Sequence, residues 1–399
     1  MRPRLLPILS ERAGGRAVRI LHVVPSYFPA IRYGGPIYSV HGLAKASAAA
    51  GHSVDVYTTN ADGAGALDVP TDCWVEVDGV RVRYFPRRWP LRLFRAPDMA
   101  TAAKAALANY DVVHIHAVFL WPIVTMARAC RRAGVPYILS PRGMLVKSLF
   151  QARSGLVKRL WVVLFDRKTI EQASALHLTA QTEADELAAF DFDLPHMAII
   201  PNGVEPMQSP DTAIGKADDP PFLLSLGRIN WKKNLPALVA ALAQSEQPAL
   251  RLVIAGNDED GDLAAVRTAI AVHHLEERVT IIDNSVTGDE KTALFITCAA
   301  FILPSLNENF GNVVVEAMAH AKPIIVTNGC GVAEVVRDAD CGIVCAPNAD
   351  SLSAAIGQLI GDPALMRKRG LAGQAYVREH LEWPAIAARM GAVYDAVIA

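Results

Sequence analysis

The sequence of 399 residues lacks several features that define common functional classes. Its six cysteines form no CxxC pair and no zinc-ligand spacing, so we expect mostly reduced core residues, as in a cytoplasmic protein. No stretch approaches the ~18 apolar residues of a spanning helix, which leaves only peripheral membrane contact. The net charge of −1 argues against a general nucleic-acid binder.

The usual nucleotide and metal signatures are also missing. GxxxxGK[ST] occurs nowhere, and no GxGxxG follows the first predicted strand, which argues against P-loop hydrolysis and nicotinamide chemistry. Three acidic triplets resemble a metal-binding DxD motif, at 191–193, 258–260 and 338–340. They lie in polar loops away from the glycine-containing turns, and we interpret them as solvated. We therefore predict no metal site and no cofactor other than a co-substrate.

What is present is enough apolar material for two domains. Hydrophobic residues make up 52% of the chain and charged residues 20%. Short β-branched runs alternate with helical patterns, which predicts parallel sheets covered by helices. The predicted strands are 19–24, 53–58, 111–115, 136–140, 175–178 and 197–200, then 222–226, 250–254, 279–282, 300–303, 323–326 and 342–344. Predicted helices include 37–50, 98–108, 236–244 and 262–274.

A proline-rich polar passage divides the strands into two sets. We predict a flexible leader at 1–18, an α/β domain at 19–203, a linker at 204–220, a second α/β domain at 221–380 and a C-terminal helix within 381–399. Two such Rossmann-like sheets predict a ligand site in a cleft between them. Residues 1–200 sum to a charge of +8 and the remainder to −9, which suggests that the first domain meets an anionic surface or substrate.

One segment after a predicted strand carries two carboxylates eight positions apart. Glu308 lies in the predicted loop and Glu316 in the following helix, at 313–320. The N–H groups of Phe310, Gly311 and Asn312 then lie at the helix N-terminus, which favours negative charge. This turn suits a ligand with both phosphates and hydroxyls.

Three other segments point to the same kind of ligand. Gly34 and Gly35 follow the first strand and let backbone approach a phosphate, although a plain strand-to-helix turn explains them equally well. Arg228 and Lys233 follow the first strand of the second domain and can neutralise a diphosphate, or can be solvated loop cations. His116 ends a strand at the predicted cleft, where a lone histidine is more often structural.

Two segments combine basic and apolar residues. Residues 81–95 interleave six arginines with four aromatics, and residues 147–168 include an apolar helical pattern with flanking lysines and arginines. Both could lie on an anionic membrane surface. A solvated basic face and a core helix are the structural alternatives.

Together and in this order, these segments resemble the family 4 glycosyltransferases of the GT-B fold. The E-x7-E pattern in Glu-Asn-Phe-Gly-Asn-Val-Val-Val-Glu is the strongest element, and Gly227-Arg228 with Lys233-Asn234 is similar to the family's G-R-x4-K-(G/N) element. The glycines at 34–35, His116 and Pro-Asn-Gly-Val at 201–204 agree with the family as well. The resemblance covers the chain from about Arg19 onward.

The resemblance implies a retaining, metal-independent transfer of a sugar from a UDP- or GDP-linked donor to a hydroxyl of a glycan or lipid-linked acceptor. It implies that Arg228 and Lys233 bind the departing diphosphate, that Glu308 faces the reacting carbon and that Glu316 holds the ribose. It also implies that His116 contacts the sugar near the reacting carbon, as a catalytic residue together with Glu308, Arg228 and Lys233. The remaining implied donor contacts come from Gly34, Gly35, Asn309, Phe310, Gly311 and Asn312. The last helix is expected to cross back onto the first domain.

Charge and family habit further suggest bacterial surface polysaccharide synthesis by a cytoplasmic enzyme, peripheral on the inner face of the membrane. The family usually has a glycine after the strand at 279–282, where Asp283-Asn284-Ser285 stands here, so the base preference stays open. Two alternatives remain within the fold: a nucleotide-sugar epimerase and a catalytically silent nucleotide-sugar binding protein. A glycoside hydrolase would use the two carboxylates but leaves Arg228 and Lys233 unexplained.

Overall fold

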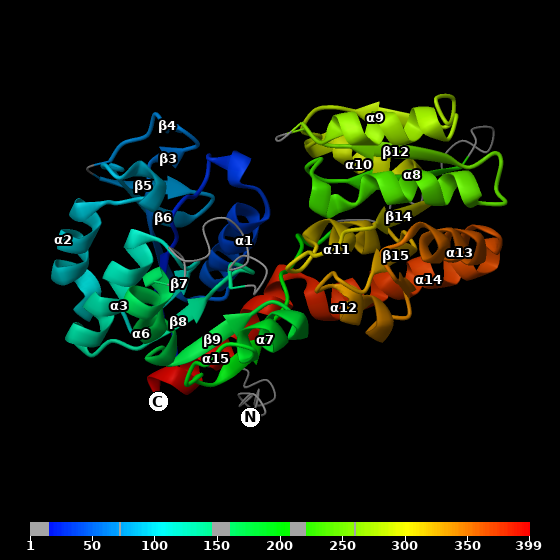
Figure 1. Cartoon of the computed structure of the whole chain (residues 1–399). Coiled ribbons are helices and arrows are strands. Elements are labelled where there is room, and N and C mark those ends of the chain that lie inside the picture. The colour runs from blue at the N-terminus through cyan, green and yellow to red at the C-terminus, as the bar shows by residue number, and fades with distance from the viewer. Residues whose placement is uncertain (1–15, 72, 146–159, 208–220, 259–260) are drawn as a thin grey trace. The chain divides into compact units, whose positions relative to one another are not determined.

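The computed structural model describes residues 16–71, 73–145, 160–207, 221–258 and 261–399. The chain divides into two compact units (Figure 1). The first contains the residues up to Gly203 together with Trp383–Ala399, and the second is Val204–Glu382. Both are α/β, as the alternation of apolar runs and helical patterns predicts.

The first unit contains an eight-stranded sheet in the order β10-β9-β8-β7-β1-β2-β6-β5. All neighbouring strands are parallel except β5, which is antiparallel to β6. The strands are β1 (Arg19–Val23), β2 (Ser53–Thr59), β5 (Trp74–Val77), β6 (Val80–Phe85), β7 (Val112–His116), β8 (Tyr137–Ser140), β9 (Ala175–Leu178) and β10 (Met197–Ile199), with a small separate hairpin of β3 (Ala61–Asp62) and β4 (Gly65–Ala66). The near-continuous burial of β1, β7, β8 and β9 is typical of parallel strands covered on both faces.

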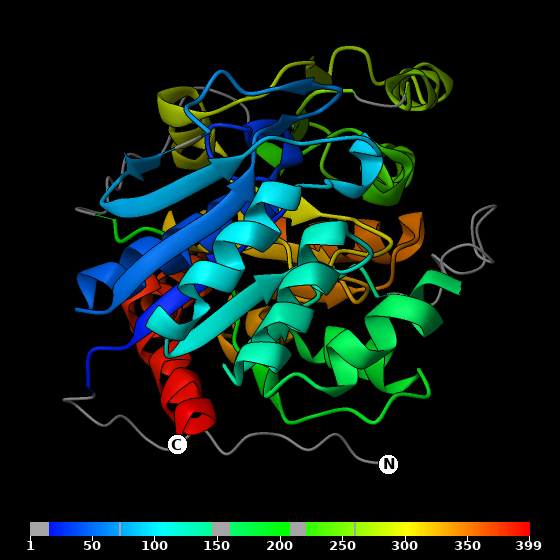
Figure 2. The same ribbon diagram turned by 90° about the vertical axis from the view of Figure 1, so that its left-hand side faces the viewer.

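Helices cover this sheet on both faces. In Figure 2, α2 and α3 lie in front of the sheet and α1 lies behind it. The helices are α1 (Gly35–Ala49), α2 (Pro97–Ala106), α3 (Trp121–Ala133), α6 (Arg167–Glu171), α7 (Gln181–Ala188) and α15 (Trp383–Ile398), with the π-helical turn η4 (Val162–Asp166) before α6. The C-terminal helix α15 packs on α1, where a Cβ at Gly42 would come within 2.1 Å of the Trp383 indole. Close approach of the two helices therefore requires glycine at position 42.

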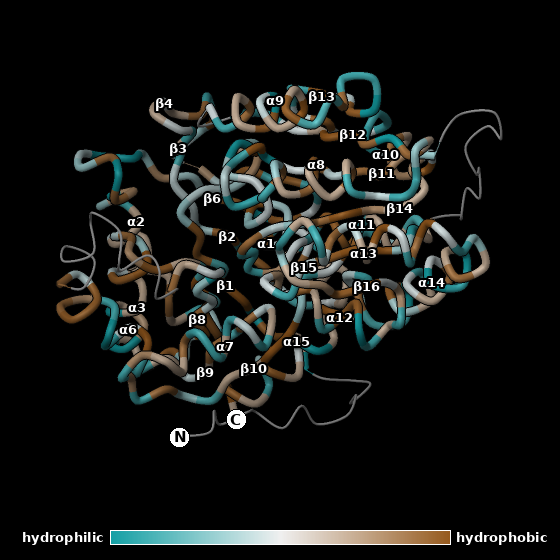
Figure 3. The backbone as a smooth tube through the Cα atoms, turned by 45° about the vertical axis from the view of Figure 1, so that its right-hand side comes forward, coloured by the Kyte–Doolittle hydropathy of each residue, from teal (hydrophilic) through white to brown (hydrophobic). Residues whose placement is uncertain are grey.

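The second unit contains a six-stranded parallel sheet in the order β13-β12-β11-β14-β15-β16. Its strands are β11 (Phe222–Leu226), β12 (Arg251–Ala255), β13 (Val279–Ile282), β14 (Ala300–Leu303), β15 (Ile324–Thr327) and β16 (Gly342–Cys345). Its helices are α8 (Leu235–Gln244), α9 (Leu263–Val272), α10 (Gly288–Thr297), α11 (Asn312–Ala319), α12 (Ala333–Asp338), α13 (Ala349–Ile360) and α14 (Pro363–Tyr376), followed by the π-helical turn η6 (Val377–Leu381). The central strand β14 is fully buried and hydrophobic, which Figure 3 shows as brown tube.

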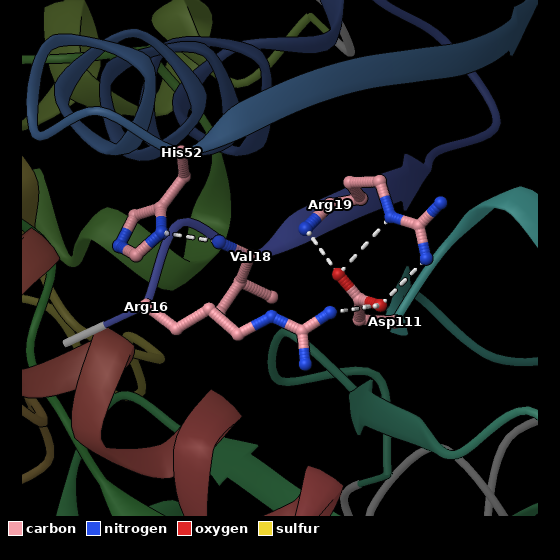
Figure 4. Close-up of polar contacts among 5 residues, drawn as sticks. All are labelled: Arg16, Val18, Arg19, His52 and Asp111. Atoms are coloured by element: carbon pink, nitrogen blue, oxygen red, sulfur yellow. Dashed lines mark hydrogen bonds and ion pairs between the residues drawn. The ribbon is translucent and has the colours of Figure 1, made fainter.

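A polar cluster ties the amino ends of β1 and β7 together (Figure 4). The backbone N–H and the guanidinium of Arg19 both donate to the Asp111 carboxylate, at 2.8 Å for the N–H to Oδ2 and for Nη2 to Oδ1. The Arg19 guanidinium lowers the pKa of Asp111 to about 2. Ligands of open α/β sheets bind at the opposite, carboxyl edge, so this cluster is structural.

The arginine-rich segment 81–95 is built into the first unit rather than standing free of it. It begins as strand β6, where Arg81 forms a bidentate pair with Asp55, and Arg87 donates to three backbone carbonyls of the loop at 63–65. The membrane interpretation missed this strand. Arg88, Trp89 and Arg92 are exposed, so only the tip of the segment offers an open basic and aromatic surface.

The second segment with a membrane interpretation, 147–168, lies partly outside the described residues. Within the described parts of the chain, no helix is long and apolar enough to span a membrane. All six cysteines are unpaired; Cys130, Cys298, Cys330 and Cys341 are buried, as the reduced-core interpretation predicts, whereas Cys73 is exposed.

Candidate functional site

The predicted turn with two carboxylates forms at the carboxyl end of β14. Strand β14 ends at Leu303, and α11 begins at Asn312, so Glu308 lies in the connecting loop and Glu316 in the helix. Gly311 precedes α11 with φ of 105°, and a Cβ there would lie 3.2 Å from both Leu303 and Val332 side-chain atoms. Only glycine meets both constraints without strain.

The loop that carries Glu308 is held by a second loop, which sequence reasoning did not identify. The Glu308 N–H donates to the Gly329 carbonyl at 3.1 Å, and the Gly331 N–H donates to the Glu308 carbonyl at 2.9 Å. The Val332 N–H donates to the Phe310 carbonyl at 2.8 Å. The Phe310 ring is buried, so this backbone pairing and the ring together fix the position of Glu308.

The G-R-x4-K element lies beside this turn because β11 and β14 are neighbours in the sheet. Lys233 Nζ donates to Glu308 Oε2 at 2.6 Å. Asn234 Nδ2 donates to the Pro304 carbonyl at 3.1 Å and to the Pro347 carbonyl at 3.0 Å. The two motifs are 75 residues apart and meet in one hydrogen-bonded corner. Arg228 is exposed on the same loop.

This corner is the point where strand order reverses in the second sheet. Strands β12 and β13 lie on one side of β11, and β14 to β16 lie on the other. Ligands of open α/β sheets bind at the carboxyl ends of strands at such a switch point. The topology therefore gives Lys233 and Glu308 the location expected of a binding site.

Glu316 has a cationic partner that the sequence pattern did not predict. Lys291 of α10 forms an ion pair with the Glu316 carboxylate, and the Lys291 ammonium lies 6.0 Å from the centre of the Phe295 ring. Both side chains of the pair are about one-quarter to one-third exposed, at 27% and 30%. A ligand that reaches Glu316 therefore also meets Lys291.

The first unit carries its predicted site residues at its own switch point, between β1 and β7. The 3₁₀ turn η1 (Ile31–Tyr33) follows β1, Gly34 with φ of 73° comes next, and α1 begins at Gly35 with Pro36 in its first turn. His116 is the last residue of β7. The helix start and the strand end agree with the sequence-based expectation within one or two residues.

His116 is fully enclosed in a group of four histidines. Its side chain is 1% exposed, and its Nε2 lies 2.9 Å from Nδ1 of His22. Arg142 Nη2 lies 3.3 Å from its Nδ1. Burial above all, then the Arg142 charge, holds the pKa of His116 well below its usual range. A neutral imidazole with both nitrogens engaged cannot act as a general base.

Three of these histidines have the spacing of a metal site. Ring nitrogens of His22, His114 and His116 lie within 4.8 Å of one another. However, these histidines already hydrogen-bond to other side chains, and the Arg142 guanidinium beside His116 would repel a cation. We interpret the group as a hydrogen-bonded structural cluster.

One acidic triplet, at 258–260, has a structural use where the structure describes it. The Asp258 carboxylate accepts the N–H groups of Gly261, Asp262 and Leu263 at the start of α9, at 2.9–3.3 Å. Asp338 ends α12, and Asp340 forms a long, exposed ion pair with Lys368 at 3.8 Å. Residues 259–260 lie outside the described parts.

Two family models match consecutive parts of the chain. Residues 34–203 match the glycosyl transferase 4-like domain, and residues 210–375 match the glycosyl transferases group 1. The first match ends at the division between the two structural units, and the second begins a few residues after it.

Known proteins resemble the chain over most of its length. It is 27% identical to a glycogen synthase of Mycobacterium tuberculosis over 94% of each chain. It is 25% identical to the GDP-mannose:cellobiosyl-diphosphopolyprenol alpha-mannosyltransferase of Xanthomonas oryzae, over 86% of each. The solved structure of Anabaena HepE with UDP-glucose superimposes with a TM-score of 0.70 at 20% identity, covering 95% of this chain and all of that one, at 100%. The two switch-point sites, the family matches and the shared architecture lead to one conclusion: this chain belongs to the group 1 glycosyltransferases and has the GT-B fold.

Proposed function

We propose that this protein is a retaining, metal-independent transferase that moves a sugar from a nucleotide-diphosphate donor to a hydroxyl of a glycan or lipid-linked acceptor. The contact between Lys233 Nζ and Glu308 Oε2, at 2.6 Å, carries the proposal. It joins a phosphate-binding cation and a carboxylate at the switch point of the second sheet. A diphosphate bound there would share Lys233, with the sugar beside Glu308.

The proposed chemistry is a balanced substitution at the anomeric carbon. The bond from that carbon to the donor phosphate breaks, the bond to the acceptor oxygen forms, and the acceptor proton passes to the departing phosphate. Lys233 and Arg228 stabilise the negative charge that grows on the diphosphate. Glu308 orients the sugar and stabilises positive charge on its ring. The N–H groups of residues 309–312 offer donors to sugar or phosphate oxygens.

The remaining predicted residues take binding roles. Glu316 holds the ribose hydroxyls, and Gly34 and Gly35 let the first unit approach a phosphate. His116 is 1% exposed and has both ring nitrogens engaged, so we limit it to holding the end of β7 beside the sugar, without a hydrogen bond to it. The two cations offer the charge that a divalent ion would otherwise supply, and Asp258 is used to cap α9, which supports a reaction without a metal.

The donor is a UDP- or GDP-linked sugar. Relatives are named for both kinds of donor, since HepE is solved with UDP-glucose and the Xanthomonas enzyme is named for GDP-mannose. That enzyme's name also gives a diphosphopolyprenol acceptor. Together with the excess of positive charge in residues 1–200, it supports an anionic, lipid-linked acceptor in bacterial surface polysaccharide synthesis.

An exposed apolar stripe supports peripheral contact with an anionic inner membrane surface. Leu160, Val163 and Leu164 are 60%, 63% and 57% exposed, and their spacing places them on one helical face. Figure 3 shows the hydrophobic colouring of these turns before α6. Lys158 and Arg159 precede the stripe in the sequence, and such a pairing of apolar and basic residues suits an anionic bilayer.

Liposome sedimentation tests the membrane contact. We expect Leu164→Ser to weaken binding to vesicles with anionic lipid, and Leu371→Ser, at an exposed leucine of the second unit, to leave it unchanged. Binding that ignores lipid charge and salt would overturn the electrostatic part of the proposal.

A donor screen tests the central proposal. Purified protein with a chelator present is mixed with UDP- and GDP-sugars, and binding is measured by calorimetry. We expect one donor to bind and to be consumed with retention of the anomeric configuration. Absence of binding to every nucleotide sugar would overturn the proposal. An epimerised free donor product would instead support the epimerase, and binding without turnover on any acceptor would support the silent binding protein.

A further inference from the structure

Two chains of hydrogen bonds run through the buried histidines of the first unit. In the first chain, Arg142 contacts Nδ1 of His116 at 3.3 Å, and Nε2 of His116 contacts Nδ1 of His22 at 2.9 Å. The rings of His22 and His116 are stacked, with an interplanar angle of 9°. His22 and His116 lie on the neighbouring strands β1 and β7, at the sheet's switch point.

The second chain runs beside the first and ends on different groups. The Tyr394 hydroxyl lies 2.9 Å from Nδ1 of His114, and Nε2 of His114 lies 3.3 Å from Nδ1 of His177. Nε2 of His177 lies 3.0 Å from the Ile200 carbonyl. Its histidines are also buried and have no hydrogen bond to Arg142, so the second chain serves as an internal control for the first.

The end groups decide where each proton is. A guanidinium only donates, so Nδ1 of His116 is an acceptor and its proton is on Nε2. That proton is donated to Nδ1 of His22, which leaves the His22 proton on Nε2, a buried atom with no hydrogen-bond partner among the described residues. The opposite assignment would place an N–H of His116 against an N–H of Arg142.

The second chain is fixed from its carbonyl end by the same reasoning. The Ile200 carbonyl only accepts, so His177 has its proton on Nε2 and accepts at Nδ1 from His114. The Tyr394 O–H then donates to Nδ1 of His114. All four imidazoles are therefore neutral and carry the proton on Nε2.

Arg142 is itself held firmly in place. It follows β8 with a left-handed φ of 56°, and the next N–H, of Gly143, donates to Glu183 Oε1 at 2.6 Å. Arg142 Nη1 donates to Asn202 Oδ1 at 2.8 Å. Arg142 is half-buried, and its Nε is buried without a hydrogen-bond partner in the described parts of the chain. Burying part of a charged guanidinium is unfavourable unless its other contacts compensate, so we expect the contacts of Arg142 to have a function.

We propose that Arg142 is a positioning residue for the transfer reaction, which fixes the His116 ring at the end of β7 in a single tautomer and orientation. The inference rests on the proposed function, in which His116 holds the end of β7 beside the donor sugar. Without Arg142, nothing would prevent the linked protons of His116 and His22 from shifting together to Nδ1. The His116 ring would then hold the end of β7 in more than one tautomer and orientation.

The tautomers can be measured without any substrate. In protein with ¹⁵N-labelled histidine, two-bond correlations distinguish a proton on Nε2 from one on Nδ1. We expect all four buried histidines to be neutral with the proton on Nε2 at pH 7. Arg142→Met should bring Nδ1–H signal to His116 and His22 and leave His114 and His177 unchanged. Tyr394→Phe, the matched control, should affect His114 and not His116.

Kinetics then test the positioning role. We expect Arg142→Met to lower kcat about tenfold, in the range seen when a partner that orients a histidine ligand is removed, with the donor KM within twofold. Arg142→Lys retains a donor and should recover most of kcat, whereas Tyr394→Phe should keep it within twofold. Wild-type His116 with a proton on Nδ1, or unchanged kcat in Arg142→Met, would overturn the proposal.

If Arg142→Met does not fold, the wild-type tautomers and Arg142→Lys decide, because loss of kcat with an unchanged Nε2–H pattern, or loss of the pattern with unchanged kcat, would overturn the proposal. A wild-type protein that transfers no sugar would defeat the proposed function and this catalytic role together. The tautomer measurement would still show separately whether Arg142 orients His116.

Discussion

Mild acid should destabilise the first unit much more than the second. Four histidines of the first unit are buried and neutral, and burial holds the pKa of each below its usual value. For His22 and His177 the pKa falls to about 3. In the second unit, among the described residues, His320 is the one histidine with a lowered pKa, and it is only half-buried.

The direction in which stability changes with pH follows from which state, folded or unfolded, binds more protons. Between pH 6.5 and about 3 the unfolded chain protonates these histidines and the folded unit does not, so stability is present above pH 6.5 and is lost as the pH falls below it. Each histidine then contributes about 2 kcal/mol of lost stability between pH 7.5 and 5.0.

Two buried carboxyl groups of the same unit act in the opposite direction. Burial raises the pKa of Asp166 to about 7, and it also raises the pKa of Glu183. The folded state therefore binds their protons first, and each group favours folding as the pH falls through its raised pKa. Over this range Asp166 offsets about 2.5 kcal/mol, and Glu183 offsets at most about 3.4 kcal/mol, the limit for any single group. The four histidine contributions, about 8 kcal/mol together, therefore leave a net loss of at least about 2 kcal/mol, which is a measurable part of the 5–15 kcal/mol typical of a domain.

Hydrogen exchange measured peptide by peptide separates the two units. After correction for the intrinsic pH dependence, amides of β1 and β7 should lose protection between pH 7.5 and 5.0, whereas those of β11 and β14 should keep it. His177→Gln retains a donor for the Ile200 carbonyl but has no titrating ring. Between pH 7.5 and 5.0 this variant should therefore lose about 2 kcal/mol less stability than the wild type. Equal protection of β1 and β7 at both pH values would refute the neutral-histidine reasoning.

Three further predictions concern the second unit. Glu308→Gln should lower the transfer rate about 10²–10³-fold through lost charge stabilisation. Its donor affinity, measured by calorimetry, should stay within a few-fold of the wild-type value. A loss of donor affinity as large as the loss of rate would assign Glu308 to binding alone. Glu316→Gln should weaken nucleotide binding about tenfold or more. Glu290 is an exposed carboxyl on α10, and Glu290→Gln should leave nucleotide binding unchanged. Similar nucleotide affinities of the two variants would remove Glu316 from the ribose site. Gly256→Ala would bring a Cβ within 1.9 Å of the Gly227 carbonyl at φ of 153° and should destabilise the second unit by at least about 3 kcal/mol. In the control Gly357→Ala, in α13, the added Cβ meets no atom within 4 Å and should stabilise the unit by about 0.5–1 kcal/mol. Equal melting temperatures of the two variants would contradict the packing account.

The sequence predicted the strands well where a short apolar run corresponds to a strand that is buried in the structure. All six strands of the second unit and six of the first were anticipated, with ends displaced by at most one residue. The strand β6 was missed because its alternation Val-Arg-Val-Arg-Tyr-Phe reads equally well as a basic amphipathic surface. Its pairing with β2 and the Arg81–Asp55 contact are long-range, so no local signal distinguishes the two.

The sequence by itself determined where the candidate site residues of the second unit lie along the fold. The spacing of Glu308 and Glu316 around a glycine, and the cations at Arg228 and Lys233, are local features that a strand-to-helix turn converts directly into position. Only the tertiary structure decided which groups face one another. Parallel strands bring together side chains far apart in the sequence, which pairs Lys291 with Glu316 and gathers four histidines from β1, β7 and β9, with Arg142 against His116. Those contacts hold His116 as a neutral, oriented ring.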